Sequence, residues 1–213
     1  MRKKILFLAG MMACCSLAGA QEISKTWVAD KGNGTYQNPV LHADYSDPDV
    51  CAAGDDFYMT ASSFNCIPGI PILHSNDLVN WSLVNCALPI QEPEEFFDKA
   101  QHGKGVWAPA IRFHNGEFYI YWGDLDYGIY MIKAKDPKGR WSKPVLVKAG
   151  KGMIDPTPLW DEDGKVYLVH AYAGSRSGVN SIVVICELNA EGTEVISDPV
   201  MVFDGNDGKN HYG

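Results

Sequence analysis

Asp47 in "SDPDV" and Asp155 in "MIDPTPLW" each stand directly before a proline and a few residues before a predicted strand. Proline fixes its own φ and biases the preceding residue toward extended backbone, so each pair would hold a short carboxylate in a defined direction. Two carboxylates whose pKa values are pushed apart are the groups that hydrolyse glycosidic bonds. Each Asp-Pro alone is more typical of a turn, so this chemistry requires that the two aspartates meet in space.

The acids around Asp47 allow a second interpretation, a calcium loop. The stretch "DYSDPD" lacks the alternating acids, the glycine and the distal glutamate of such a loop. We therefore interpret Asp44 and Asp49 as solvated or turn acids. The residues predict no metal site and no cofactor.

The segments that must position these acids read as β-strands, and none is a convincing helix. They are rich in aromatic and β-branched residues and are bounded by glycine, aspartate, asparagine or proline. The only helix candidate, "EPEEFFDKA", predicts a loop with at most one or two turns. The predicted strands are "DDFYMTASSF", "GEFYIYWG", "YGIYMIKAK", "GKVYLVHAYA" and "NSIVVICELN".

Several of these segments repeat one another at intervals of about 50 to 60 residues, which is typical of β-propeller blades. "DDFYMTA" returns as "NGEFYIYW" and again as "DGKVYLVH", and "NDLVNWSLV" returns as "DPKGRWSKPVLV". We therefore predict an all-β propeller with about three blades in this chain, and the aromatic strand as the inner strand of each. A β-sandwich is the alternative. Because inner strands start near the central channel, Asp47 and Asp155 would converge from different blades.

The N-terminus, "MRKKILFLAGMMACCSLAGAQ", reads as a secretory signal at residues 1–20, with a basic start, an apolar run and small residues before the cut. Cys14 and Cys15 raise a lipoprotein interpretation, but we favour cleavage after Ala20 and export to the periplasm or medium. Residues 21–37 would form an N-terminal extension. No later run reaches 18 apolar residues, so we expect no membrane span.

The charge balance argues against nucleic acid as a partner. Removing residues 1–20 takes away three basic residues and leaves 15 basic against 26 acidic ones, an excess that does not suit a phosphate backbone. Four cysteines remain. They allow three disulfide pairings or free thiols, and the sequence leaves these open: Cys51, Cys66, Cys86 and Cys186.

Three longer stretches in combination resemble glycoside hydrolase family 43: "QNPVLHADYSDPDVCAAGDDFYMTASSFNCIPGIPILHSNDLVNWSLV", "GVWAPAIRFHNGEFYIYW" and "KGMIDPTPLWDEDGKVYLVHAYAGSR". The resemblance implies a five-bladed β-propeller with β-xylosidase, α-L-arabinofuranosidase or endo-arabinanase activity. It implies xylo- or arabino-oligosaccharides of hemicellulose as partners. Residues 38–213 would then be a partial catalytic propeller.

The resemblance also implies roles for particular residues. Asp47 matches the general base that activates water, and Asp155 matches the third acid, which tunes and orients the general acid. Phe64 in "SSFN" and Trp107 in "VWAP" fall where the family places aromatic walls near the sugar. An aromatic face suits the C–H face of a sugar, although core packing explains either residue equally well.

Two further positions matter to the resemblance. His74 in "LHSND" matches a recurrent position of the first blade, and we expect a structural, hydrogen-bonded role for it. Where many members continue Trp-Ala-Pro with aspartate, this chain has Ala110. This chain therefore cannot form the local contacts that the aspartate makes in those members.

The general acid of the family is a glutamate in a Glu-Gly-Pro context, and these 213 residues contain no such segment. Glu191 reads as part of a hairpin loop and Glu187 as a surface acid on a strand. We therefore expect the chain alone to be inactive. Calcium occurs in some relatives through residues of later blades, and nothing in this sequence supports a site for it.

Two other functions compete with this interpretation. A non-catalytic carbohydrate-binding or interaction propeller would keep Phe64 and Trp107 but has no need of both Asp47 and Asp155. The retaining fructan hydrolases share the five-bladed form. Their nucleophile lies in an Asn-Asp-Pro-Asn-Gly type of motif, which "YSDPDV" does not reproduce.

Overall fold

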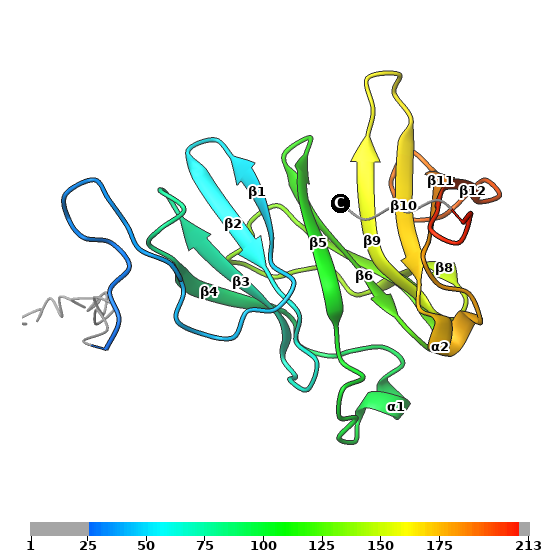
Figure 1. Cartoon of the computed structure of the whole chain (residues 1–213), viewed down its shortest axis with the longest axis horizontal. Coiled ribbons are helices and arrows are strands. Elements are labelled where there is room, and N and C mark those ends of the chain that lie inside the picture. Colours follow the sequence, from blue (N-terminus) through cyan, green and yellow to red (C-terminus); the bar gives the residue numbers. More distant parts are fainter. Residues whose placement is uncertain (1–25, 209–213) are drawn as a thin grey trace, which may run out of the picture.

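The computed structural model describes residues 26–208, and nearly all regular structure in that range is β (Figure 1). Each of three antiparallel sheets has four strands joined in sequence order. Blade 1 holds β1 (Asp49–Ala53), β2 (Asp56–Thr60), β3 (Gly69–Ser75) and β4 (Ser82–Leu88). Blade 2 holds β5 (Trp107–His114), β6 (Glu117–Asp124), β7 (Gly128–Ala134) and β8 (Val145–Ala149). Blade 3 holds β9 (Met153–Trp160), β10 (Val166–Tyr172), β11 (Ile182–Leu188) and β12 (Val200–Asp204).

The blades stand side by side, and β5 contacts both β1 and β9. The first strands of the three blades therefore meet, as the inner strands of a propeller do. Three separate sheets exclude the β-sandwich. The two helices of the described range are single turns, α1 (Glu94–Phe97) and α2 (Gly174–Ser177), and α1 confirms the prediction for "EPEEFFDKA".

The prediction of which strand is innermost is wrong by one strand. The aromatic segments form β2, β6 and β10, the second strand of each blade. The second strand of a blade pairs with a strand on each side. Large apolar side chains suit such a position, because a strand inside a sheet can be buried on both of its faces. The innermost strands instead carry small residues, acids and prolines, as in "DVCAA" of β1 and "MIDPTPLW" of β9. An edge strand tolerates proline because one row of its N–H groups is not needed for pairing.

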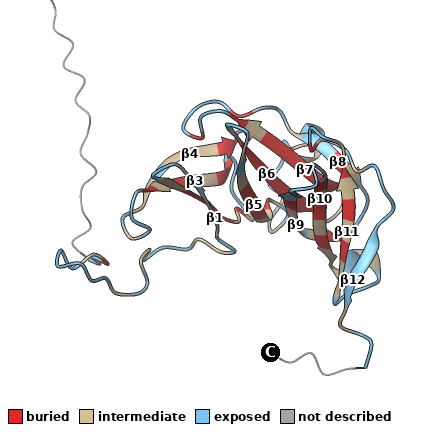
Figure 2. Cartoon of the chain, turned by 90° about the horizontal axis from the view of Figure 1, so that it is seen from above, coloured by how far each residue is buried: buried red, intermediate tan, exposed pale blue. Residues whose placement is uncertain are grey.

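The core lies on both faces of blade 2, because side chains of β6 alternate between its two neighbours. Phe118, Ile120 and Trp122 pack into the cluster shared with blade 1. Tyr119 and Tyr121 pack into the cluster shared with blade 3. Figure 2 shows this burial concentrated in the middle sheet. The strand "EFYIYWGD" therefore fixes how the three blades are stacked.

The four cysteines of the described range are free thiols, with Cys186 buried and Cys66 exposed. Burial raises the pKa of Cys51 to about 12, so its thiol stays protonated at neutral pH. The predicted signal at residues 1–20, with Cys14, Cys15 and Ala20, lies outside the described residues. Within residues 26–208 no helix is long and apolar enough to cross a membrane.

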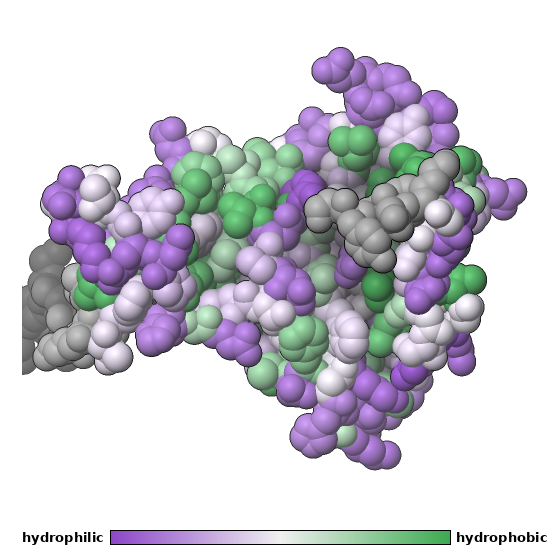
Figure 3. Space-filling model, viewed as in Figure 1, coloured by the Kyte–Doolittle hydropathy of each residue, from purple (hydrophilic) through white to green (hydrophobic). Residues whose placement is uncertain are grey.

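The outer edge strand of blade 3, β12, carries exposed apolar residues. On β12, Val200, Met201, Val202 and Phe203 keep between 42% and 62% of their surface in solvent. In the view of Figure 3, hydrophobic patches alternate with hydrophilic ones. Because most side chains of β12 are exposed and most of those of β6 are buried, the outer edge of blade 3 is less well covered than the faces of blade 2.

Candidate active site

One backbone feature repeats at the entrance of all three first strands. Asp47, Ala108 and Asp155 each precede a proline, and each has a positive φ, of 51°, 34° and 53°. We expected extended backbone at Asp47 and Asp155, and that expectation is wrong. Left-handed backbone is uncommon for residues other than glycine, and aspartate adopts it more readily than most. The three blades thus bend alike, and two of the three equivalent positions carry a carboxylate.

The Asp47 carboxylate is held by two serine hydroxyls. Ser62 Oγ donates to Asp47 Oδ2 at 2.6 Å, and Ser46 Oγ donates to the same oxygen at 3.0 Å. Ser62 Oγ in turn accepts a hydrogen bond from the backbone N–H of Ala108 at 2.8 Å. Asp47 is therefore tied through Ser62 to the entrance of β5, while its side chain remains open to solvent.

Asp155 lies within β9, two residues after its start, on the other side of β5 from Asp47. Its side chain is also open to solvent. Desolvation by the surrounding chain and the negative charge of Asp47 together raise the pKa of Asp155. The structure thus brings the two predicted aspartates, from blades 1 and 3, close enough to interact electrostatically.

Phe64 and Trp107 form an edge-to-face pair at the junction of blades 1 and 2. Their ring centroids are 5.7 Å apart with an interplanar angle of 87°, and both residues are half-buried. The Trp107 indole donates to Gly103 O at 2.9 Å, which fixes the ring. Phe64 follows Ser62 by two residues and Trp107 directly precedes Ala108, so the aromatic pair lies next to the serine that holds Asp47.

The junction between the blades places this pair. Ser63 N donates to Val106 O at 2.9 Å, and Gly105 N donates to Phe64 O at 2.8 Å. A Cβ on Gly105 would lie 2.3 Å from Ser63 O. The absence of a side chain at position 105 therefore permits the close approach of the two backbones.

The interpretation of Asp49 as a solvated or turn acid is wrong. Its Oδ2 accepts a hydrogen bond from Ile111 N at 2.7 Å and forms an ion pair with Arg112. Both partners lie on β5, so Asp49 joins blade 1 to blade 2. The sequence around Asp49 gives little sign of this ion pair, because Arg112 is distant from Asp49 in the sequence. Asp44 is exposed, as expected.

His74 has the expected structural role. Its Nε2 contacts Asp56 Oδ1, and Asn76 donates to the same oxygen at 2.9 Å. These hydrogen bonds lower the pKa of Asp56.

Ala110 is buried, 5% exposed, and pairs with Tyr121 across the sheet. An acid at this position would therefore stand against the core. Of the two glutamates that we set aside, one lies on β11 and the other in the turn that follows it. Glu187 pairs with Lys165 at 2.9 Å on blade 3, and Glu191 lies in an exposed turn.

Two hollows lie near these elements. A cavity of about 320 Å³ adjoins Trp107 and is closed by α1 and α2, with Phe96, Asp124, Asp126 and Arg176 among its lining residues. Arg176 pairs with Asp126 at 2.8 Å. Burial raises the pKa of Asp124. Neither Asp47 nor Asp155 lines this cavity.

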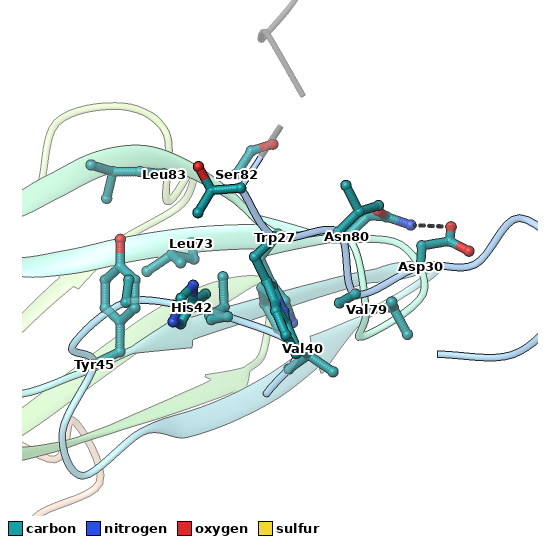
Figure 4. Close-up of a pocket in the computed structure, with 16 residues that line it drawn as sticks. Trp27, Asp30, Val40, His42, Tyr45, Leu73, Val79, Asn80, Ser82 and Leu83 are labelled. Carbon is teal, nitrogen blue, oxygen red and sulfur yellow. Dashed lines mark hydrogen bonds between the residues drawn. The ribbon is translucent and has the colours of Figure 1, made fainter. Parts of the chain in front are cut away.

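A larger groove of about 610 Å³ lies between residues 26–45 and blade 1 (Figure 4). Trp27, His42 and Tyr45 line it, and Asn80 donates to Asp30 at 2.9 Å at one end. Its lining comes from that segment and blade 1 alone, so it is separate from the aspartate pair. No cluster of three potential metal ligands occurs within residues 26–208.

Three four-stranded blades whose first strands lie side by side have the architecture of a β-propeller. The family model for glycosyl hydrolases family 43 matches residues 36–212, and the chain belongs to that family. This confirms the predicted all-β propeller class, with about three blades in this chain.

Curated relatives carry xylosidase and arabinofuranosidase names. A "Beta-xylosidase" of Formosa agariphila is 34% identical over 200 residues, which cover 87% of this chain and 34% of the relative. A "Non-reducing end alpha-L-arabinofuranosidase" of Bacteroides ovatus is 38% identical over 139 residues, covering 63% of this chain and 26% of the relative. The chain thus spans about a third of the length of the relatives that it matches.

Solved structures agree with the sequence relatives. The GH43 protein BlXynB of Bacillus licheniformis superimposes with a TM-score of 0.66 at 32% identity, covering 80% of this chain and 34% of that one. A xylan beta-1,4-xylosidase from Bacillus halodurans superimposes with a TM-score of 0.67 at 26% identity, with 80% and 34% covered.

Proposed function

We propose that this chain serves the hydrolysis of xylosidic or arabinofuranosidic linkages in hemicellulose by inversion. Asp47 would be the general base and Asp155 the carboxylate that tunes the general acid. The observation that carries the proposal is the electrostatic interaction between these two Asp-Pro carboxylates from different blades, with an aromatic pair next to the serine that holds Asp47. The names of the family 43 relatives support the substrate class.

The hydrogen bonds of Asp47 suit a base. Both serine hydroxyls bind Oδ2, and none of the described residues donates a hydrogen bond to Oδ1. Oδ1 is therefore the oxygen available to take a proton from water as that water attacks the anomeric carbon. A base must be within hydrogen-bond reach of the proton that it removes, and a carboxylate open to solvent meets that condition.

Asp155 would act through charge. Desolvation and the charge of Asp47 raise its pKa, and an ionised Asp155 would in turn raise the pKa of a neighbouring carboxylic acid. A general acid with a raised pKa stays protonated until it donates to the leaving oxygen. Asp155 thus fits a tuning role better than the role of proton donor.

The sugar would lie against Phe64 and Trp107. Both rings are half-buried, so each offers part of its surface to a ligand while the rest packs in the junction. The C–H face of a pyranose or furanose ring packs well on such a surface. Substitution of either residue by leucine would then weaken sugar binding more than it weakens the fold.

The 213 residues contain no Glu-Gly-Pro segment that would supply the general acid. We therefore propose that the expected inactivity of the chain alone applies to substrates with poor leaving groups, which it would turn over only slowly if at all, whereas strongly activated glycosides need no acid and can still be hydrolysed. Assistance from a general acid typically contributes about a hundred- to ten-thousand-fold. We also propose that residues 1–20 direct export, that residues 21–37 are an N-terminal extension, and that residues 38–213 are a partial catalytic propeller.

The test is a series of aryl β-D-xylosides and aryl α-L-arabinofuranosides whose leaving groups differ in acidity. If the site has a general base but no general acid, we expect measurable hydrolysis of the most activated glycosides. The rate should then fall steeply as the leaving group becomes more basic. Equal rates across the series would show that a proton donor is present and would refute the slow-turnover proposal. Sugar binding without hydrolysis of any member would favour the carbohydrate-binding propeller.

A further inference from the structure

The Ser62 hydroxyl joins three parts of the candidate site. It donates to Asp47 Oδ2 at 2.6 Å and accepts from Ala108 N at 2.8 Å. The backbone of the same residue donates to Ser46 O at 2.9 Å. One short side chain therefore links the segment before β1, the end of β2 and the entrance of β5.

The geometry also fixes the direction of the hydroxyl. A serine hydroxyl has one hydrogen to donate and two lone pairs to accept with. Because the Ala108 N–H occupies a lone pair, the hydroxyl hydrogen is free to point at Asp47. Ser46 makes the longer contact, 3.0 Å, with the same carboxylate oxygen, and it is the immediate neighbour of Asp47 in the chain. Ser62 is thus the partner that relates Asp47 to another blade.

Both residues that the Ser62 hydroxyl contacts have unusual backbone. Asp47 and Ala108 have φ values of 51° and 34°. Such conformations persist where the surroundings fix them, and they cluster at functional sites. The shared partner of these two strained positions is the Ser62 hydroxyl.

We propose that Ser62 is a positioning residue that holds the Asp47 carboxylate in its working orientation and couples that orientation to the entrance of blade 2. Because the hydroxyl binds Oδ2, the other oxygen, Oδ1, stays free to face an attacking water molecule. That catalytic consequence rests on the proposed function. The positioning itself does not, because it concerns only where Asp47 stands relative to Asp155 and Ala108.

The test compares Ser62→Ala with Ser62→Thr, which keeps the hydroxyl, and with Ser142→Ala as a matched control. Ser142 Oγ accepts a backbone N–H from Lys133 at 3.0 Å, much as Ser62 accepts one, but it contacts no carboxylate. Circular dichroism would establish that each variant folds. Ser62→Cys, of nearly the same size but with a weak donor, replaces Ser62→Ala if that variant does not fold.

The first readout is the titration of the Asp155 carboxyl by carbon-13 NMR, with Asp47→Asn as the reference for loss of the Asp47 charge. We expect the pKa of Asp155 to fall in Asp47→Asn and to fall part of the way in Ser62→Ala. A carboxylate that is no longer tethered is repelled from Asp155 and acts on it less. Ser62→Thr and Ser142→Ala should keep the wild-type value. An unchanged Asp155 titration in Ser62→Ala, or in Asp47→Asn itself, would overturn the proposal.

The second readout is hydrolysis of 2,4-dinitrophenyl β-D-xyloside. We expect Ser62→Ala to lower kcat by about ten- to hundred-fold with little change in KM, because a misplaced base mainly affects the chemical step. Ser62→Thr should restore most of the rate. Absence of hydrolysis in the wild-type chain would count against the proposed function, whereas the titration would still decide the role of Ser62.

Discussion

Gly105 is the position where we expect a single added methyl group to damage the candidate site most. A Cβ there would lie 2.3 Å from Ser63 O and 2.7 Å from Phe64 O, both backbone atoms of blade 1. Ordinary contact begins at 3.4 Å, so Gly105→Ala requires the two backbones to separate by about 1 Å. Gly105 N also donates to Phe64 O at 2.8 Å, and this hydrogen bond would stretch with the junction.

The cost follows from these two effects. Overpacking typically costs about 1–3 kcal/mol, and weakening one backbone hydrogen bond costs about 1 kcal/mol. The expected loss is therefore about 2–4 kcal/mol. At about 2–4 °C per kcal/mol for a chain of this size, the melting temperature should fall by roughly 4–16 °C. The Phe64–Trp107 pair lies at the same junction, so sugar binding should weaken as well.

The assay is thermal unfolding by circular dichroism, followed by sugar titration monitored by tryptophan fluorescence. Gly139→Ala is the matched control, since a Cβ there would meet its nearest atom, Asp136 O, at an ordinary 3.4 Å. The control should melt and bind like wild type. A Gly105→Ala protein that melts within about 1 °C of wild type would refute the close approach of the two backbones.

Three further outcomes follow from the remaining groups. Burial raises the pKa of Asp124, so folding favours the protonated form of this carboxyl. The stability that protonation provides is fully present below the unfolded pKa of 3.8 and is lost as pH rises through the folded pKa. Asp124→Asn should therefore match wild type near pH 3 and exceed its stability at pH 7 in urea unfolding. Asp49→Ala should destabilise more than Arg112→Ala in the same assay, by about 1–3 kcal/mol, because only the former leaves a backbone N–H of β5 without its acceptor. At pH 8 iodoacetamide should label the exposed Cys66 rather than Cys51, whose pKa is about 12, as peptide mass spectrometry would report.

The sequence predicts the blades well because their strands follow a strong physical pattern. Alternation in "EFYIYWGD" sends Ile120 and Trp122 to one neighbour and Tyr121 to the other. The repeat of such segments is enough to give the propeller class. It does not tell which strand lies innermost, because both the first and second strands are bounded by turn residues. The burial of the aromatic strand between two neighbours decides that point.

The site is predictable only in part. The two Asp-Pro pairs point to Asp47 and Asp155, yet the left-handed backbone at both runs against the local preference before proline. That conformation depends on contacts from another blade, such as the bond from Ala108 N to Ser62. Ser62 and Arg112 gain their roles from partners 46 and 63 residues away in the chain, a distance over which local patterns carry no information.

The equivalence of the three blade entrances also becomes visible only in the structure. Asp47, Ala108 and Asp155 occupy corresponding places, although the sequence around Ala108 reads as an aromatic Trp-Ala-Pro motif rather than an acidic one. An alanine between two carboxylates adds no third charge at the centre. The middle blade therefore contributes Trp107 to the aromatic pair and blade 1 contributes Phe64, while the acids come from blades 1 and 3.

The measurement that tests the central claim most directly is hydrolysis of 2,4-dinitrophenyl β-D-xyloside by the wild-type chain, Asp47→Asn and Asp44→Asn. This leaving group needs no general acid, so the rate reports the base alone. Asp44 is an exposed acid three residues away and serves as the control for removing a charge from the same loop. We predict hydrolysis above the spontaneous rate for wild type and Asp44→Asn, and a fall to the spontaneous rate for Asp47→Asn. Equal rates for wild type and Asp47→Asn would contradict the assignment of Asp47 as the base.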